Sequence, residues 1–350
     1  MEAGFNDTFS DEGLSPSTPW SKEFVFESSN QRLIAAIVTC LVTVIGIPGN
    51  SMVILAVMLS KKLQNRTNVF VVNLACADML TCSVLPFQAV ALLSETWPLS
   101  TELCGAVAIL MWLGLGSAVM NLALIAFTRY SIITKSRAFT DRMFTNNRIC
   151  LLVCGAWLIP PVFILIPPAF GVGAVAYSHR YKLCTADSTN PMSDIYAYIS
   201  LLVELPCLVV IIVCYFNIYR FVRKAGFNLT QSKRFTIANG LQNWGKTPQI
   251  STEVAVFHRQ VKVTKKLFII VCTYIICVMP FGLACAIPAP IYPIIPWAYL
   301  LLFLNLCLNP IIYGIKHPQF KEVFWPIITC SWKNIPEPSS LIASFSNIAT

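Results

Sequence analysis

Charged residues are scarce in this chain of 350 residues. They account for 12% of it, whereas hydrophobic residues account for 56%. Soluble domains usually carry about 25% charged residues, so the shortage excludes an ordinary soluble protein and indicates that lipid is the solvent. The chain also has only three histidines. Because the apolar sequence holds no metal-ligand spacing and no nucleophile–base pair, an enzyme is not expected.

Long apolar runs are abundant instead. Seven of them are close to or above the roughly 20 residues that cross the hydrocarbon core of a bilayer. Backbone groups in lipid must bond within their own segment, so each run is predicted to be a helix. The predicted fold class is therefore an all-α membrane protein, a seven-transmembrane helix bundle. The predicted spans are 33–59, 69–93, 103–127, 149–166, 195–219, 267–287 and 294–315.

Carboxylates are almost missing from these runs, in which Asp78 and Glu204 are the two acids. A channel or transporter needs polar groups along a continuous path. The first and last three spans also show no internal repeat of the kind that many transporters have. A ligand-gated receptor is therefore favoured, with a membrane transporter or channel as the alternative.

The distribution of basic residues sets the predicted orientation. Lysine and arginine gather in the tail and in the loops after spans one, three and five, whereas acids gather in the N-terminal segment and the other loops. Under the positive-inside rule, the N-terminus is extracellular and the protein is a multi-pass plasma-membrane protein. The net charge of +9 is thus a topology signal. No nucleic-acid partner is expected, because no base-stacking platform accompanies the basic residues.

Two modifications follow from this orientation. Asn6 lies outside in an Asn-Asp-Thr sequon and is a candidate for glycosylation, whereas the sequons at Asn65 and Asn228 lie inside, where this modification does not occur. Cys104 begins the third span at its outer end, and Cys184 lies in the outer loop before the fifth. Because that compartment is oxidising, we expect a disulfide between them that holds the loop over the mouth of the bundle.

Short motifs recur along the spans. Pro310 removes a helical hydrogen bond in the last span, and a nearby asparagine is expected to satisfy the freed carbonyl. The motifs, in order, are Gly49-Asn50, Leu74-Ala75-Cys76-Ala77-Asp78, Cys104, Thr128-Arg129-Tyr130, Trp157, Pro206, Cys277-Val278-Met279-Pro280 and Asn309-Pro310-Ile311-Ile312-Tyr313. With them the chain resembles a rhodopsin-family (class A) G-protein-coupled receptor over nearly its full length. Within that family it resembles the melatonin-receptor-like orphan branch, which includes the Moody and Tre-like invertebrate receptors.

The resemblance implies coupling to a heterotrimeric G protein when span six moves outward. The family usually places an acid just before the arginine of span three, where this chain has Thr128, and the usual acid at the inner end of span six is also missing. With both restraints weakened we expect raised basal signalling; the alternative is that other packing holds the resting state. The residues implied in coupling and activation are Thr128, Arg129, Tyr130, Tyr215, Asn309, Pro310 and Tyr313.

Spans five and six depart from the family pattern. Val278 stands where span six usually has a tryptophan, so the role of that residue is absent or falls on Tyr274 or Phe281. The tyrosine of span five usually lies eight residues after the proline, but Tyr215 lies one residue further from Pro206. Either a one-residue bulge restores its direction or the side chain is misdirected.

An allosteric sodium ion is the one cofactor that the resemblance raises. Its ligands would be Asp78, Asn305 and Asn309. However, Ala118 stands in the place of an expected serine, with Ser117 beside it. The sequence therefore leaves sodium binding open.

The resemblance places the ligand between the outer halves of spans three, five, six and seven. Amine receptors have an aspartate where Met111 stands, and opsins have a lysine where Phe303 stands, so neither ligand class is favoured. The remaining wall is apolar and aromatic, which suits a neutral indole-like molecule, a lipid or the hydrophobic end of a peptide. The ligand-binding candidates are Gln88, Met111, Leu115, Glu204, Phe281, Cys285, Tyr299 and Phe303.

The predicted organisation has four parts: an extracellular tail at 1–30, the receptor domain at 31–316, an amphipathic eighth helix at 317–330 and a cytoplasmic tail at 331–350. The inner loop at 220–262 is predicted to be a solvated connector. Cys330 is a candidate for palmitoylation. Arrestin is a candidate partner through four tail serines, Ser339, Ser340, Ser344 and Ser346.

Overall fold

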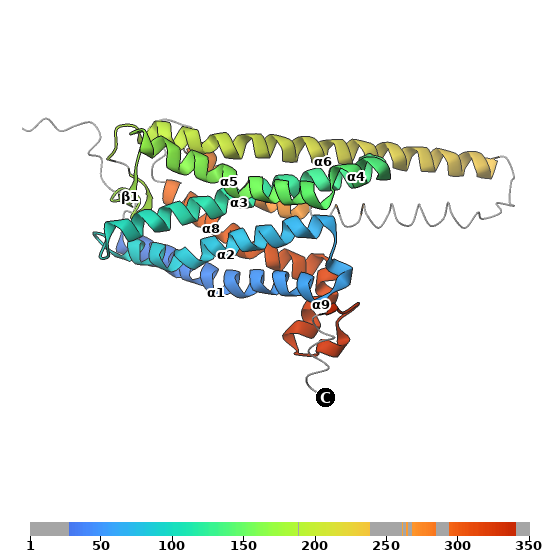
Figure 1. Cartoon of the computed structure of the whole chain (residues 1–350), viewed down its shortest axis with the longest axis horizontal. Helices are drawn as coiled ribbons and strands as arrows, with labels where there is room; N and C mark the ends of the chain where they lie inside the picture. Colours follow the sequence, from blue (N-terminus) through green and yellow to red (C-terminus); the bar gives the residue numbers. More distant parts are fainter. Residues whose placement is uncertain are drawn as a thin grey trace, which may run out of the picture.

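The computed structural model describes residues 28–187, 189–238, 261, 264, 268–284 and 294–340; for residues 194, 200 and 226–238 it describes the backbone alone. Within these ranges six helices are long and apolar enough to cross a membrane, and a shorter apolar helix, Phe268–Ala284, lies at the predicted sixth span. The six are α1 (Ser29–Leu59), α2 (Arg66–Leu93), α3 (Thr101–Thr134), α5 (Asn146–Ala169), α6 (Ser193–Ala238) and α8 (Ile295–Lys316). They lie side by side in one bundle, which confirms the predicted fold class (Figure 1).

The helices extend beyond the apolar runs because polar residues cap them. The side chain of Asn65 accepts a hydrogen bond from the backbone N–H of Asn68 (3.1 Å), and Ser100 accepts one from Leu103 (3.3 Å). These side chains satisfy donors that the first turn of a helix leaves unpaired. As a result α2 and α3 begin before the apolar stretches predicted at 69–93 and 103–127.

The predicted connector at 220–262 is wrong in its first part, because α6 continues without interruption to Ala238. That stretch holds five lysines and arginines, which favour a helix, and no proline. The polarity of this stretch was therefore not sufficient evidence for a loop. Figure 1 shows α6 running well past the ends of the neighbouring helices.

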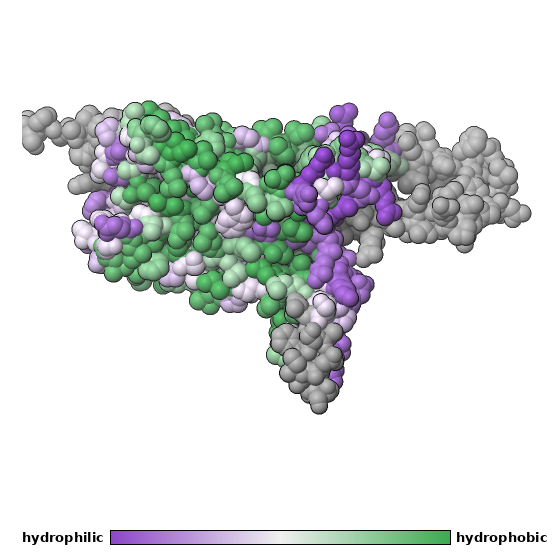
Figure 2. All heavy atoms as spheres, viewed as in Figure 1, coloured by the Kyte–Doolittle hydropathy of each residue, from purple (hydrophilic) through white to green (hydrophobic). Residues whose placement is uncertain are grey.

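Large apolar side chains cover the outside of the bundle. Leu151 is 71% exposed, Leu158 68% and Val44 67%. In water such a surface would associate or aggregate, whereas in a bilayer it faces lipid. Figure 2 shows the apolar surface over the middle of the bundle and hydrophilic residues gathered towards its ends.

A two-stranded sheet covers one end of the bundle, which we call the hairpin end. Strands β1 (Val175–Ser178) and β2 (Leu183–Ala186) are antiparallel, with Tyr177 opposite Cys184. Cys184 forms the expected disulfide with Cys104 at the start of α3, with 5.2 Å between the two Cα atoms.

Short helices lie at the opposite end, which we call the Arg129 end. They are η1 (Lys61–Leu63), α4 (Arg137–Met143), α9 (Pro318–Ile328) and η3 (Trp332–Asn334). Helix α9 corresponds to the predicted eighth helix. It buries Phe320, Val323 and Phe324 and leaves Trp325 69% and Ile328 59% exposed. Four predicted site residues, Asn6, Cys285, Ser344 and Ser346, lie outside the described residues.

Candidate functional site

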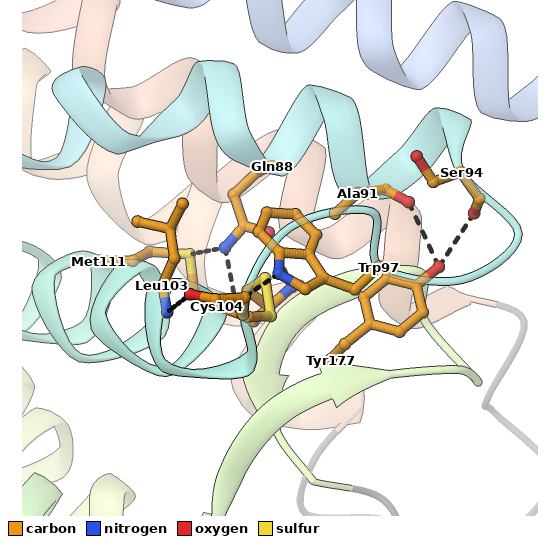
Figure 3. The surroundings of a disulfide bond; sticks show 10 residues. Gln88, Ala91, Ser94, Trp97, Leu103, Cys104, Met111 and Tyr177 are labelled. Atoms are coloured by element: carbon orange, nitrogen blue, oxygen red, sulfur yellow. Dashed lines mark hydrogen bonds between the residues drawn. A yellow bond between two sulfur atoms is a disulfide. The ribbon is translucent and has the colours of Figure 1, made fainter.

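Gln88 of α2 joins the sheet to the bundle. Its amide nitrogen donates to the carbonyl of Cys184 (2.7 Å), and its amide oxygen accepts from the backbone N–H of Cys184 (2.9 Å). The side chain is fully buried, and its amide nitrogen also lies 3.3 Å from the sulfur of Met111 (Figure 3). Gln88, predicted to bind ligand, thus has its polar atoms engaged in holding β2 beside the disulfide.

A cluster of aromatic rings lies near this sheet. Trp112 of α3 is 5.6 Å from Phe281 and 6.2 Å from Tyr299, measured between ring centroids. Phe281 is 4.7 Å from Tyr299, which in turn is 6.1 Å from Phe303. The hydroxyl groups of Tyr299 and Thr185 are 2.7 Å apart, so β2 reaches the cluster directly. Three predicted ligand-binding residues therefore meet.

Trp112 is the member of this cluster that was missing from the predicted wall. The signal available was weak, because Trp112 only follows Met111 in an apolar run. Adjacent residues of a helix point in different directions, so spacing alone did not place Met111 and Trp112 on the same inward face. Met111 and Leu115 are also buried on α3, one turn apart.

Glu204, another ligand-binding candidate, lies on α6, which contributes none of these four rings. It is half-buried on α6 and lies within electrostatic range of Tyr274, which belongs to the facing helix Phe268–Ala284. A carboxyl between two spans in lipid is costly unless polar groups surround it. Glu204 can therefore interact with Tyr274 and link α6 to the sixth span.

A second group of predicted residues meets at the Arg129 end. The guanidinium of Arg129 lies within electrostatic range of the hydroxyl groups of Tyr215 on α6 and Tyr313 on α8. All three side chains are buried, with exposures of 6%, 7% and 2% respectively. Since α6 is continuous α-helix through this region, no bulge is needed to direct Tyr215 inward. The ring of Tyr215 also contacts Phe268 of the sixth span, 5.2 Å away.

Thr128 bonds within its own helix. Its hydroxyl donates to the carbonyl of Leu124 (2.7 Å), a common partner for a threonine in a helix. A neutral side chain engaged in this way exerts no charge on Arg129. Tyr130 faces Lys135 instead, whose ammonium is 5.5 Å from its ring centroid.

A cavity of about 930 Å³ opens beside Arg129. Two further arginines, Arg66 and Arg137, line it together with polar groups such as Gln319. Arg66 also forms an ion pair with Asp141 of α4 (2.6 Å), which fixes that short helix at the rim. The cavity therefore presents positive charge to whatever enters it.

Polar residues form a buried cluster between the two ends. Asn309 donates to one carboxylate oxygen of Asp78 (2.9 Å), and Asn50 donates to the carbonyl of Leu306 (2.9 Å). Leu306 precedes Pro310 by four residues, so this is the carbonyl that the proline leaves without a helical donor. The predicted role of an asparagine near Pro310 is met by Asn50 of α1.

Oxygen atoms in this cluster remain available to a cation. The second carboxylate oxygen of Asp78 and the amide oxygens of Asn305 and Asn309 are buried and accept no hydrogen bond within the described part of the chain. Ser117 is fully buried and its hydroxyl has no hydrogen-bond partner there, so a hydroxyl is present although Ala118 has none. An oxygen-only donor set of this kind fits a hard cation such as sodium.

Residues 49–313 match the model of the 7 transmembrane receptor (rhodopsin family). The chain belongs to this family. As a rhodopsin-family receptor it is a G-protein-coupled receptor and a multi-pass membrane protein, and a transporter or channel is not favoured. The class to which it belongs is not one of enzymes.

Relatives of the receptor point to one branch of the family. It is 30% identical to human melatonin receptor type 1B over 300 residues, which cover 83% of this chain and 76% of that protein. It is 25% identical to the G-protein coupled receptor moody of Drosophila melanogaster, covering 91% of this chain and 53% of that longer protein. Squid rhodopsin has the same fold, with a TM-score of 0.74 at 21% identity over 89% of this chain and 91% of the squid chain. The predicted melatonin-receptor-like and Moody-like branch is confirmed.

Proposed function

We propose that this receptor lies in the plasma membrane with its N-terminus and hairpin end outside and its Arg129 end in the cytoplasm. The distribution of basic residues supports this orientation. The disulfide between Cys104 and Cys184 supports it too, because that bond persists in an oxidising compartment.

The ligand that fits the hairpin end is a neutral, largely apolar molecule. The observation that carries this proposal is the cluster of Trp112, Phe281, Tyr299 and Phe303, contributed by three different spans. Flat rings in offset or edge contact accept another flat ring readily, so an indole-like molecule is the first candidate, with a lipid or a hydrophobic peptide end as alternatives. The names of the melatonin-receptor relatives support an indole.

The proposed mechanism is a population shift between two arrangements of the spans. The sixth span touches the aromatic cluster through Phe281 at one end and Tyr215 through Phe268 at the other. A ligand that binds one arrangement better increases its population. Outward movement of this span, which contacts Tyr215 near Arg129, would then expose Arg129 to a heterotrimeric G protein.

Four further assignments belong to the same proposal. Sodium would bind at Asp78, Asn305 and Asn309 and act on the same equilibrium. Cys330, exposed just after α9, would carry a palmitoyl chain beside the exposed Trp325 and Ile328. Serines of the tail would recruit arrestin after phosphorylation, and Asn6 would be glycosylated.

Nucleotide exchange on purified heterotrimers tests the main proposal. Neutral indoles, lipids and peptides are screened with the purified receptor, and active compounds are then tested on Phe281→Leu. That variant should lose at least about tenfold in potency, whereas Phe216→Leu, at a lipid-facing position that is 57% exposed, should keep it. Arg129→Ala should lose exchange for every ligand. If no compound accelerates exchange on any heterotrimer while receptor-containing vesicles show solute flux, the transporter alternative holds instead.

A further inference from the structure

Residues 335–339, which we call the tail strap, fold back from α9 onto the loop between α1 and α2. The backbone N–H of Lys61 donates to the carbonyl of Glu337 (2.8 Å), and the N–H of Ser339 donates to the carbonyl of Leu59 (2.9 Å). Ser60 and Pro338 face each other in an antiparallel bridge. The tail strap thus pairs with the loop as an added strand, using main-chain bonds.

Side chains strengthen this docking. The hydroxyl of Ser60, which is fully buried, donates to the carbonyl of Pro336 (2.6 Å). Ile335 is only 3% exposed. A separate ion pair between Lys62 and Glu322 (2.5 Å) ties the same loop to α9 and does not involve the tail strap.

The sequence of the tail strap makes docking easy to form and easy to reverse. Pro336 and Pro338 fix their own backbone angles, so the free segment is already extended and loses little freedom on docking. Glu337 between them has φ of +47°, a left-handed conformation that is unfavourable for a residue with a side chain. The docked state is therefore held by a few hydrogen bonds against local backbone strain.

Ser339 is the point at which this balance can be changed. It is 4% exposed, and its hydroxyl oxygen is buried without a hydrogen-bond partner within the described residues. A phosphoryl group brings about two negative charges and three oxygen atoms, which have no room at a buried oxygen. Ser340, the next residue, is exposed and can carry the same group without displacing the strap.

We propose that Ser339 is a concealed phosphorylation site, reached when the tail strap leaves the loop, and that phosphorylation there keeps the strap released. In the docked state a kinase reaches Ser340 but not Ser339. Release exposes both serines together with the backbone edge of residues 59–61. The γ-phosphoryl group of ATP is transferred to the Ser339 hydroxyl oxygen. The bond between the γ-phosphorus and the bridging oxygen of ATP breaks, the bond between Ser339 Oγ and phosphorus forms, the hydroxyl proton is released and ADP leaves.

Hydrogen exchange at the amide of Lys61 in the purified receptor measures docking of the tail strap, and Lys61 itself is unchanged in every variant. The amide of Lys61 should exchange at least about tenfold faster in a variant that ends at Asn334, because its acceptor has been removed. Ser339→Glu should exchange like the truncated variant, whereas Ser339→Ala and Ser340→Glu should exchange like the unmodified receptor. Equal exchange in the full-length and truncated proteins, protection in Ser339→Glu, or release in Ser340→Glu would each overturn the proposal.

A reversible lock tests access to the serine itself. Ser60→Cys with Pro338→Cys places two thiols across the bridge, where oxidation can join them. After incubation with a purified receptor kinase and ATP, the oxidised double variant should carry phosphate at Ser340 but not at Ser339, and the reduced one at both of these serines. Phosphate at Ser339 in the oxidised protein, or at Ser339 in neither form, would contradict the assignment. Neither readout depends on the ligand or on a G protein.

Discussion

Asn50 of α1 donates a hydrogen bond to the carbonyl of Leu306 in α8, the carbonyl that Pro310 leaves unpaired. The same amide donates to the carbonyl of Gly46 in its own helix (3.0 Å). One buried side chain thus supplies the donor that the Leu306 carbonyl lacks and joins the two helices.

Replacing this amide should therefore destabilise the receptor. Asn50→Ala leaves a buried carbonyl without a donor, which costs about 1–3 kcal/mol, and the unfolding temperature of the purified protein should fall. Thr43→Ala on the same helix is the matched control, because its hydroxyl bonds only to the carbonyl of Thr39 (3.2 Å) and can be lost at little cost. An unchanged unfolding temperature in Asn50→Ala would show that another group satisfies Leu306.

Gln88→Leu should loosen the hairpin end. It removes both hydrogen bonds to the backbone of Cys184 while keeping the side-chain size, and leaving these buried groups unpaired costs about 1–3 kcal/mol. The disulfide should then be reduced faster by dithiothreitol. Gln64→Leu, whose amide bonds carbonyls at the Arg129 end, should leave the reduction rate as it is. Equal rates in all three proteins would mean that the disulfide holds β2 without help.

Glu95 should make the unfolding temperature of the receptor depend on pH, through its ion pairs at the hairpin end. Arg32 (2.7 Å) and Lys182 (3.3 Å) contact its carboxylate and lower the pKa of this exposed group below its usual value. Because the folded-state pKa is lowered, the stabilisation is complete above the usual carboxyl pKa of about 4.3 and is lost as pH falls through the lowered value. The difference in unfolding temperature between the unmodified receptor and Glu95→Gln should shrink to nothing in acid. A difference that persists at pH 3 would show that charge is not its cause.

Thr128→Asp should lower ligand-free nucleotide exchange. A carboxylate next to Arg129 supplies a partly buried charge pair worth about 1 kcal/mol or more, which corresponds to about fivefold in the active population. Thr128→Asn has the same size without the charge and should lower exchange less. At equal expression, unchanged exchange in the aspartate variant would mean that other packing holds the resting state.

Sodium should stabilise the receptor through Asp78. In sodium chloride the unfolding temperature should exceed that in choline chloride at equal ionic strength, because only sodium is small enough for a buried oxygen site. Asp78→Asn should remove the difference while keeping an oxygen for Asn309. The same unfolding temperature in both salts for the unmodified protein would exclude the ion.

The sequence predicted the bundle and the residues on its inner faces, because lipid makes span length and polarity strongly informative. It did not predict contacts that depend on how the helices sit together. The role of an asparagine near Pro310 was foreseen, but its origin in α1 was not. Gln88 was predicted to contact the ligand because spacing shows only that a residue faces inward. Spacing does not show which group the side chain contacts there. Trp112 was missed for the same reason.

Segments outside the membrane were the least predictable. The continuation of α6 to Ala238 was missed because a polar stretch was interpreted as a loop, although it holds no proline to end the helix. The docking of residues 335–339 could not be foreseen from the tail alone, since its hydrogen-bond partners lie more than 270 residues away in the sequence. Such distant pairing leaves no periodic pattern.

The sixth span is attached differently from its neighbours. Hydrogen bonds through Asn50 and Asp78 join α1 and α2 to α8. In helix Phe268–Ala284, by contrast, Phe268 and Phe281 contact rings of neighbouring helices, and the Thr273 hydroxyl bonds back to Ile269. Dispersion between rings varies gently with displacement, whereas a buried hydrogen bond breaks abruptly. A small displacement of Phe281 therefore breaks none of the hydrogen bonds that join α1, α2 and α8, and the same helix carries it to Phe268, which contacts Tyr215.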